Sequence, residues 1–87
     1  MTKQQIYRRV RKVVAETLGI AEQELLPGLR LTEDLQADSM QMVTILIALD
    51  DEFDAEFRPE DIPPHAVTLQ WISEFVELSI AADRARV

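Results

Sequence analysis

The stretch from Asp38 to Phe53, DSMQMVTILIALDDEF, decides how this chain folds. Its apolar residues recur at helical spacing, and either Asp38 or Ser39 can cap the start of a helix. One stripe is assigned to the core and consists of Ile45, Leu46, Leu49 and Phe53. A second stripe consists of Met40, Val43 and Ile47. This second stripe is either more core, the usual meaning of such spacing, or an exposed ridge that binds partners.

Two further amphipathic helices are expected, one on each side of this stretch. The first runs from about Lys3 to Leu18 and stops at Gly19, a typical C-terminal residue. Its apolar positions are Ile6, Val10, Val13, Val14 and Leu18. The last helix follows Thr68, which can cap it. Its core positions are Leu69, Ile72, Phe75, Val76 and Ile80.

The two connections between these helices differ in composition. Residues 20–38 contain the turn signal Pro27–Gly28 and several leucines, which predicts a long loop packed onto the helices. In residues 54–67, Pro59, Pro63 and Pro64 restrict any helix to about one turn, near Pro59 to Ile62. The pair Pro63–Pro64 is expected to end that turn.

Length and composition fit one small domain. The chain has 87 residues, of which 47% are hydrophobic, and no segment alternates like a half-buried strand. We therefore expect an all-α fold: a small bundle of three main helices plus one short helix, with a long loop between the first and second helices. The single domain spans 1–87, with a core over about 3–80 and a fraying C-terminal tail over 81–87.

Charge is unevenly distributed along the chain. The net charge is −7, and five of the nine basic residues precede Val13. The stretch from Val13 to Asp83 contains all sixteen acidic residues but only two basic ones, Arg30 and Arg58. Such a field repels nucleic acid and anionic lipid, and it attracts partners with basic patches. We therefore expect no nucleic-acid partner.

Other absences narrow the class of protein. No apolar run approaches the roughly 20 residues that span a bilayer, so no membrane insertion is expected. The chain has no cysteine, which excludes disulfides, thiolate metal sites and cysteine nucleophiles, and fits a reducing compartment. The expectation is a soluble, cytoplasmic protein.

The sequence holds two partial patterns of conventional functional sites. Asp50, Glu52 and Asp54 alternate like a calcium loop, but Ala55 and Asp61 stand where that loop needs glycine and glutamate, so no metal site is expected. Ser39 and His65, the single histidine, are a distant candidate for a small hydrolase, without a Gly-x-Ser-x-Gly elbow. No catalytic residue is assigned, and a lone Ser39 would ordinarily be a helix cap.

The surroundings of Ser39 change that interpretation. Residues 33–40, EDLQADSM, resemble the phosphopantetheine attachment motif of acyl carrier proteins, usually Asp-Leu-Gly-Ala-Asp-Ser-Leu. Residues 48–53, ALDDEF, resemble the family's Ala-Leu-Glu-Glu-Glu-Phe close of the second helix. Leu18-Gly19-Ile20, Thr68-Leu69 and Phe75-Val76 also follow the family pattern. The resemblance covers about Ile6 to Val76 and suggests a specialised bacterial-type acyl carrier protein.

This resemblance implies a carrier rather than an enzyme. Ser39 would receive 4′-phosphopantetheine from coenzyme A through a phosphopantetheinyl transferase, which Asp38 would help to bind, through the transferase's magnesium. The arm's thiol would hold acyl groups as thioesters for enzymes with basic docking patches. The partner-binding residues would be Met40, Val43, Ile47, Asp50, Asp51 and Asp54. The acyl chain would enter between the helices, against Ile45, Leu46, Leu49 and Phe75, in a monomeric protein.

Several positions depart from the family pattern. Gln36 replaces a usual glycine, Met40 a leucine, and Gln41 and Thr44 replace acids. Trp71, in place of a common aspartate, is either a core residue at the end of the bundle or an exposed contact. These departures suggest a specialised role in fatty-acid, polyketide or modified-lipid synthesis, or an aminoacyl or peptidyl carrier. The alternative from another class is a non-carrier acidic interaction module in which Ser39 only caps a helix.

Overall fold

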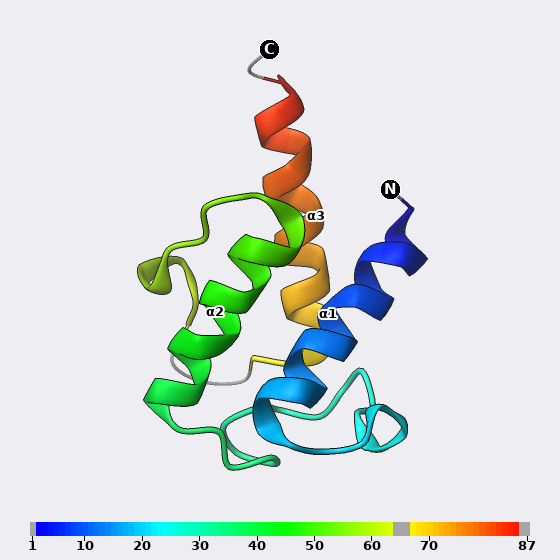
Figure 1. Ribbon diagram of the computed structural model, residues 1–87, viewed down its shortest axis with the longest axis vertical. Coiled ribbons are helices and arrows are strands. Elements are labelled where there is room, and N and C mark those ends of the chain that lie inside the picture. Colours follow the sequence, from blue (N-terminus) through cyan, green and yellow to red (C-terminus); the bar gives the residue numbers. More distant parts are fainter. Residues whose placement is uncertain (1, 64–66, 86–87) are drawn as a thin grey trace.

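Three long helices carry the fold, as Figure 1 shows for the computed structural model, which describes residues 2–63 and 67–85. In chain order the elements are α1 (Lys3–Leu18), η1 (Glu22–Glu24), α2 (Ser39–Phe53), η2 (Pro59–Asp61) and α3 (Leu69–Ala85). Within those ranges no strand forms, and Arg30 and Thr68 make an isolated antiparallel bridge. The expected all-α bundle is therefore confirmed, with η1 as an additional short turn.

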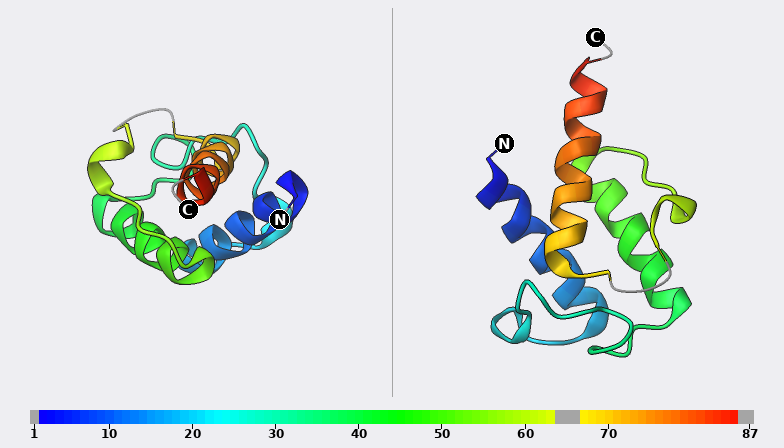
Figure 2. Two further views of the ribbon diagram at one scale, coloured as in Figure 1. Left: turned by 90° about the horizontal axis from the view of Figure 1, so that it is seen from above. Right: turned by 180° about the vertical axis from the view of Figure 1, so that it is seen from behind.

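Helix α1 is the centre of the arrangement, because it packs against both α2 and α3. It runs antiparallel to both of them, and the C-terminal turns of α3 project beyond the rest of the bundle (Figures 1 and 2). Its start is closed by a capping box: Thr2 Oγ1 accepts from the Gln5 N–H at 3.2 Å, and Gln5 Oε1 accepts from the Thr2 N–H at 2.8 Å. It ends at Gly19, whose φ of 70° is left-handed.

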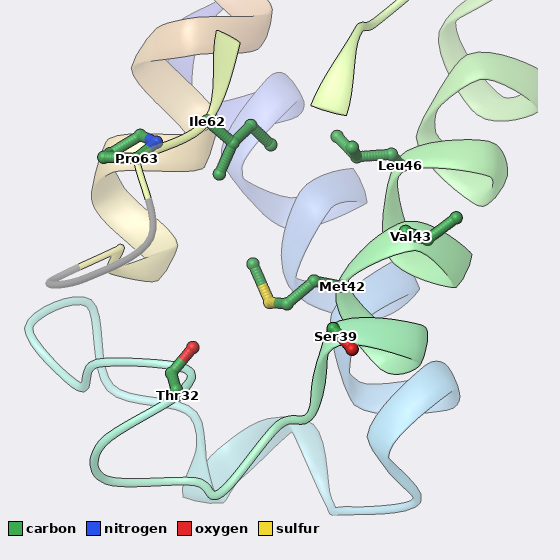
Figure 3. Close-up of a pocket in the computed structure, with 7 residues that line it drawn as sticks. All are labelled: Thr32, Ser39, Met42, Val43, Leu46, Ile62 and Pro63. Atoms are coloured by element: carbon green, nitrogen blue, oxygen red, sulfur yellow. The ribbon is translucent and has the colours of Figure 1, made fainter. Parts of the chain in front are cut away.

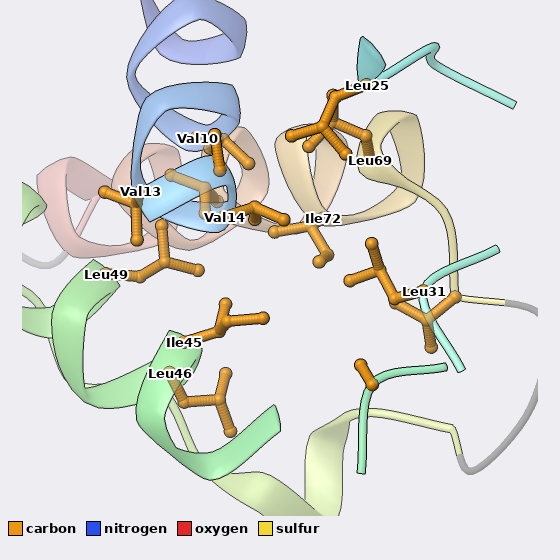
Figure 4. Packing of buried hydrophobic residues seen from close by; sticks show 14 of the residues in the cluster. Val10, Val13, Val14, Leu25, Leu31, Ile45, Leu46, Leu49, Leu69 and Ile72 are labelled. Carbon is orange, nitrogen blue, oxygen red and sulfur yellow. The ribbon is translucent and has the colours of Figure 1, made fainter. Parts of the chain in front are cut away.

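Buried aliphatic side chains from all three helices meet in one core (Figure 4). The fully enclosed members include Val10, Val14, Ile45, Leu49, Leu69, Ile72 and Val76. The connection between α1 and α2 adds Leu25 and Leu31, so the expected packing of this loop is confirmed for them. Leu26 differs, since 59% of its surface is exposed.

Backbone hydrogen bonds tie this long connection to the start of α3. The Leu31 N–H donates to the Val67 carbonyl at 2.8 Å, and the Gln70 N–H donates to the Pro27 carbonyl at 3.2 Å. Thr68 caps α3 as expected, because its Oγ1 accepts from the Trp71 N–H at 3.0 Å. The loop and the helix start therefore hold each other in place.

The far end of α3 differs from the prediction. We expected a fraying tail over 81–87. Helix α3 continues to Ala85, because the alanines and the arginine there favour helix, and residues 86–87 lie outside the described part of the chain. Trp71 is partly buried and stacks on Phe75 with ring centroids 5.2 Å apart, which fits the core interpretation. Pro64 and His65 lie outside the described residues, and so does the suggested pairing of Ser39 with His65.

Candidate functional site

Ser39 is the first residue of α2, and Asp38 is its cap. Asp38 Oδ1 accepts from the Gln41 N–H at 2.7 Å, while Gln41 Oε1 accepts from the Asp38 N–H at 3.0 Å. Sequence reasoning noted Gln41 only as a lost acidic residue and missed this capping box. The pattern of an Asp followed three residues later by a Gln was the available signal. Asp38 and Gln41 therefore cap α2, and Ser39 does not.

The Ser39 hydroxyl is available for modification. The residue is exposed, and none of the residues in 2–63 or 67–85 makes a hydrogen bond with its hydroxyl. It lies on the first turn of a fifteen-residue helix, where unpaired backbone N–H groups and the helix dipole favour a phosphate. The serine therefore fits a phosphodiester-linked group chemically and sterically.

The chain reaches Ser39 through a left-handed residue. Gln36 has φ of 60°, a conformation that glycine adopts freely and other residues adopt at a cost. This geometry explains why a glycine is usual in the motif that residues 33–40 resemble. The next residue, Ala37, is buried and donates its N–H to the Leu31 carbonyl at 2.9 Å. The serine is thus presented by a backbone that is anchored two residues earlier.

An ion pair closes the turn ahead of Gln36. Arg30 donates from its guanidinium to both carboxylate oxygens of Asp34, at 3.1 and 2.9 Å, and its N–H donates to Asp34 Oδ2 at 2.8 Å. The side-chain hydrogen bonds from Arg30 hold the pKa of Asp34 below its ordinary value, with the backbone hydrogen bond adding to the effect. This pair keeps the turn compact at neutral pH.

A pocket of about 270 Å³ opens beside Ser39 (Figure 3). Its lining consists of Thr32, Ser39, Met42, Val43, Leu46, Ile62 and Pro63. Of the four residues expected to contact an acyl chain, Leu46 lies in this lining. Ile45 and Leu49 instead face the closed core with 1% exposure each, and Phe75 stacks with Trp71.

Sequence reasoning missed Met42, Thr32 and Ile62 as pocket residues. Met42 was detectable, because it follows Ser39 by three positions and precedes Leu46 by four, so the three share one face of a helix. Thr32 and Ile62 come from loops, and no local pattern indicates what a loop packs against.

The second apolar stripe of α2 is exposed. Met40, Val43 and Ile47 are 78%, 43% and 58% exposed, so the alternative of additional core is wrong and the ridge interpretation holds for their position. Two of the three expected docking acids, Asp51 and Asp54, are exposed as well.

Asp50 has a structural task beyond adding surface charge. It is partly buried, and its Oδ1 accepts from the Phe57 N–H at 2.8 Å. Its carbonyl also accepts from the Ala55 N–H at 3.2 Å. Asp50 therefore ties the chain that follows α2 back onto the helix, a role that a sequence pattern of clustered acids does not indicate.

Two negative findings apply to the described part of the chain. No group of three or more acidic or histidine side chains there is arranged to hold a metal ion. None of the helices described has both the length and the apolar character that a membrane crossing requires.

Comparison with known proteins agrees with this geometry. The family model for the phosphopantetheine attachment site matches residues 8–78. An acyl carrier protein of Cyanidioschyzon merolae is 34% identical over 76 residues, which cover 87% of this chain and 82% of that relative. The chain therefore belongs to the acyl carrier protein family: it is a carrier of acyl groups rather than an enzyme, and its cofactor is 4′-phosphopantetheine.

Proposed function

We propose that Ser39 is the residue that carries the 4′-phosphopantetheine arm. The observation that supports this most strongly is its exposed, unbonded hydroxyl at the first turn of α2. In the transfer, a bond forms between Ser39 Oγ and the phosphorus of the arm, and the adenosine bisphosphate half of coenzyme A leaves. The hydroxyl proton passes to the transferase. Once bound, the arm supplies the thiol that holds an acyl group as a thioester.

Asp38 is proposed to assist the transferase. One carboxylate oxygen, Oδ1, caps α2 through the Gln41 N–H. The other oxygen, Oδ2, accepts no hydrogen bond from the residues the structure describes, and it lies on the residue next to Ser39. A divalent cation held by the transferase prefers such a carboxylate oxygen. Asp38 thus serves both the helix start and the modification step.

As a family member the protein interacts with a transferase, with synthase enzymes and with acyl chains. We propose that the ridge of Met40, Val43 and Ile47 contacts these enzymes. Asp51 and Asp54 would steer basic patches of the partners toward the ridge through long-range attraction. Asp50 would add to that field while holding Phe57.

We further propose that the cargo is a largely hydrocarbon acyl group in fatty-acid, polyketide or modified-lipid synthesis. The pocket that Ser39 lines supports this, because Leu46 and Ile62 in its lining are aliphatic. A polar aminoacyl group would find no matching charge in that lining. The interaction-module alternative loses its basis in the helix cap, since the cap is Asp38.

We keep the sequence-based proposal of a monomeric, cytoplasmic protein. A reducing compartment is supported by the absence of cysteine from the sequence. A monomer is supported by the small apolar ridge, whose three side chains fall well short of the roughly 800 Å² per partner that stable interfaces bury. Light scattering and cell fractionation test the two points.

Intact mass spectrometry tests the function. The protein is incubated with coenzyme A, magnesium and a broad-specificity phosphopantetheinyl transferase, and Ser39→Ala is treated in parallel. We expect the mass of one phosphopantetheine to be added to the wild type and nothing to be added to the variant. A gain in Ser39→Ala would move the attachment site elsewhere. No gain with several transferases would contradict the proposal.

A further inference from the structure

Met42 lies between two ends of the pocket beside Ser39 (Figure 3). Thr32 and Ser39 line one end, and Leu46 and Ile62 line the other. The Met42 side chain projects from α2 into the space that separates these two ends. It is partly buried there. A chain that entered from Ser39 would therefore meet Met42 before it reached Leu46.

The two walls of this pocket differ in stiffness. One wall is α2, a regular helix of fifteen residues. The opposite wall, Ile62 and Pro63, follows the single turn η2, which is closed by the Asp61 N–H donating to the Arg58 carbonyl at 3.1 Å. A short turn with few such bonds opens more easily than a full helix. Methionine is also the most adaptable apolar side chain, because it is unbranched.

We propose that Met42 is a specificity-determining residue that sets how much of an acyl chain the pocket accepts. The proposal rests on Ser39 carrying the arm. The open space of about 270 Å³ falls below the range of roughly 300–1,000 Å³ that is common for small-molecule sites. The pocket therefore holds a short segment as it stands, and a longer chain requires the Met42 side chain to move.

The expected signature is a limit on chain length. Each further methylene that leaves water favours the buried chain about fourfold. That gain continues while the pocket has room and stops when Met42 and the Ile62 wall leave none. Removing the Met42 side chain beyond its Cβ moves the limit to longer chains, and enlarging the side chain moves it to shorter ones.

The matched control lies two residues away on the same helix. Met40 is also a methionine of α2, but 78% of its surface is exposed and it does not line the pocket. Met40→Ala therefore removes the same atoms from the same helix without changing the space beside Ser39. Because Met40 belongs to the ridge proposed to contact enzymes, this variant is compared only in samples whose loading is complete by intact mass, and only for the chain-length limit. Any effect of chain length that is shared by both variants would come from the helix and not from the pocket.

The experiment loads the protein with acyl chains from acetyl to tetradecanoyl, transferred from the matching acyl-coenzyme A, and confirms each product by intact mass. Methyl NMR shifts of Leu46 and Ile62 then report chain entry, and hydroxylamine cleavage reports thioester protection. In the wild type we expect the changes in methyl shift and the protection from hydroxylamine to increase with chain length and then to level off. Met42→Ala should level off at a longer chain, Met42→Phe at a shorter one, and Met40→Ala at the wild-type length.

Three outcomes would overturn the proposal. An unchanged limit in both Met42 variants would show that another residue sets it. Shifts that do not depend on chain length in a correctly loaded wild type would show that the pocket holds no chain, although Ser39 would remain the attachment site. Failure of every loading reaction would remove the function on which the proposal rests. If circular dichroism shows that Met42→Ala is unfolded, Met42→Phe against Met42→Leu provides the same comparison.

Discussion

The two connections between the long helices are anchored in different ways and border different parts of the candidate site. Residues 19–38 are anchored by buried Leu25 and Leu31 and by two backbone hydrogen bonds, from the Leu31 N–H to the Val67 carbonyl and from the Gln70 N–H to the Pro27 carbonyl. In the described part of residues 54–68, the anchors are buried Phe57 and Val67, the Phe57 N–H bonded to Asp50, and the single turn η2. The first connection must present one serine in a fixed place, whereas the second forms one wall of a pocket. A long loop can thus be held in place as well as a shorter one, because packing and not length decides its order.

The largest expected effect comes from breaking the first connection. Leu31 has no exposed surface, so Leu31→Ala leaves a cavity and should lower the free energy of unfolding by about 2–5 kcal/mol. Urea denaturation followed by circular dichroism measures the change. Leu26→Ala is the matched control in the same loop, and its 59% exposure predicts almost no effect. Equal losses in the two variants would mean that this loop is not anchored by burial.

A smaller effect is expected from loosening the second connection. Asp50→Ala removes the acceptor of the Phe57 N–H and should cost about 1–3 kcal/mol, because that partly buried donor is left unpaired. Asp51→Ala removes the same charge from an exposed neighbouring position and should cost little. Hydrogen exchange of the Phe57 amide checks the mechanism, since it should accelerate only in the Asp50 variant.

At the junction between the first connection and α2, Asp38 caps the helix, while the neighbouring Ser39 is the proposed attachment residue. Asp38→Ala should destabilise the protein by about 1 kcal/mol, the usual value of a lost cap. Ser39→Ala should leave the thermal midpoint almost unchanged, since its hydroxyl makes no hydrogen bond with the described residues. Scanning calorimetry of the two variants compares them. A clear loss of stability in Ser39→Ala would revive the view of this serine as a structural cap.

Removing the unfavourable left-handed conformation of Gln36 should stabilise the first connection, unlike the substitutions above. Gln36→Gly removes the cost of a positive φ and should stabilise the protein by about 0.5–1 kcal/mol, after the greater freedom of glycine in the unfolded chain is subtracted. Gln36→Val should destabilise it, because a branched side chain fits that backbone region poorly. Chemical denaturation decides the sign of each change.

The smallest expected effect concerns pH and the Arg30–Asp34 pair. The pKa of Asp34 is lowered in the folded protein by the hydrogen bonds from Arg30, so the pair's contribution is complete above the unfolded value near 4. It is lost as pH falls through the folded pKa. The stability difference between wild type and Asp34→Asn should therefore shrink in acid. Because the Arg30 side chain is 49% exposed and the Asp34 side chain 30% exposed, added salt should also reduce it.

Local sequence signals were sufficient for the helices. The limits of α1 and α2 followed from apolar spacing and from residues such as Gly19 and Asp38, which act on their immediate neighbours. The position of Ser39 followed from the same signals. Tertiary relations were not accessible in this way: Ile45 and Leu46 are adjacent and both belong to the core, yet of the two only Leu46 also lines the pocket, together with Ile62.

Asp50 and Gln36 illustrate the same limit. A run of acids indicates a docking surface, but the Phe57 N–H that lies against Asp50 depends on how the following loop returns. A glutamine in place of a glycine indicates a departure from the family, but the positive φ appears only once the loop is closed. Sequence patterns therefore indicated a candidate site, while its lining and its supports required the fold.

The projecting end of α3 has a practical consequence. Ser39 lies at one end of the bundle, at the start of α2, and the last turns of α3 leave the bundle at the opposite end (Figure 1). A dye, an affinity tag or a surface linker joined beyond Ala85 would consequently stand far from the proposed attachment site. The molecule could then be immobilised or tracked during loading while the end that carries Ser39 stays accessible.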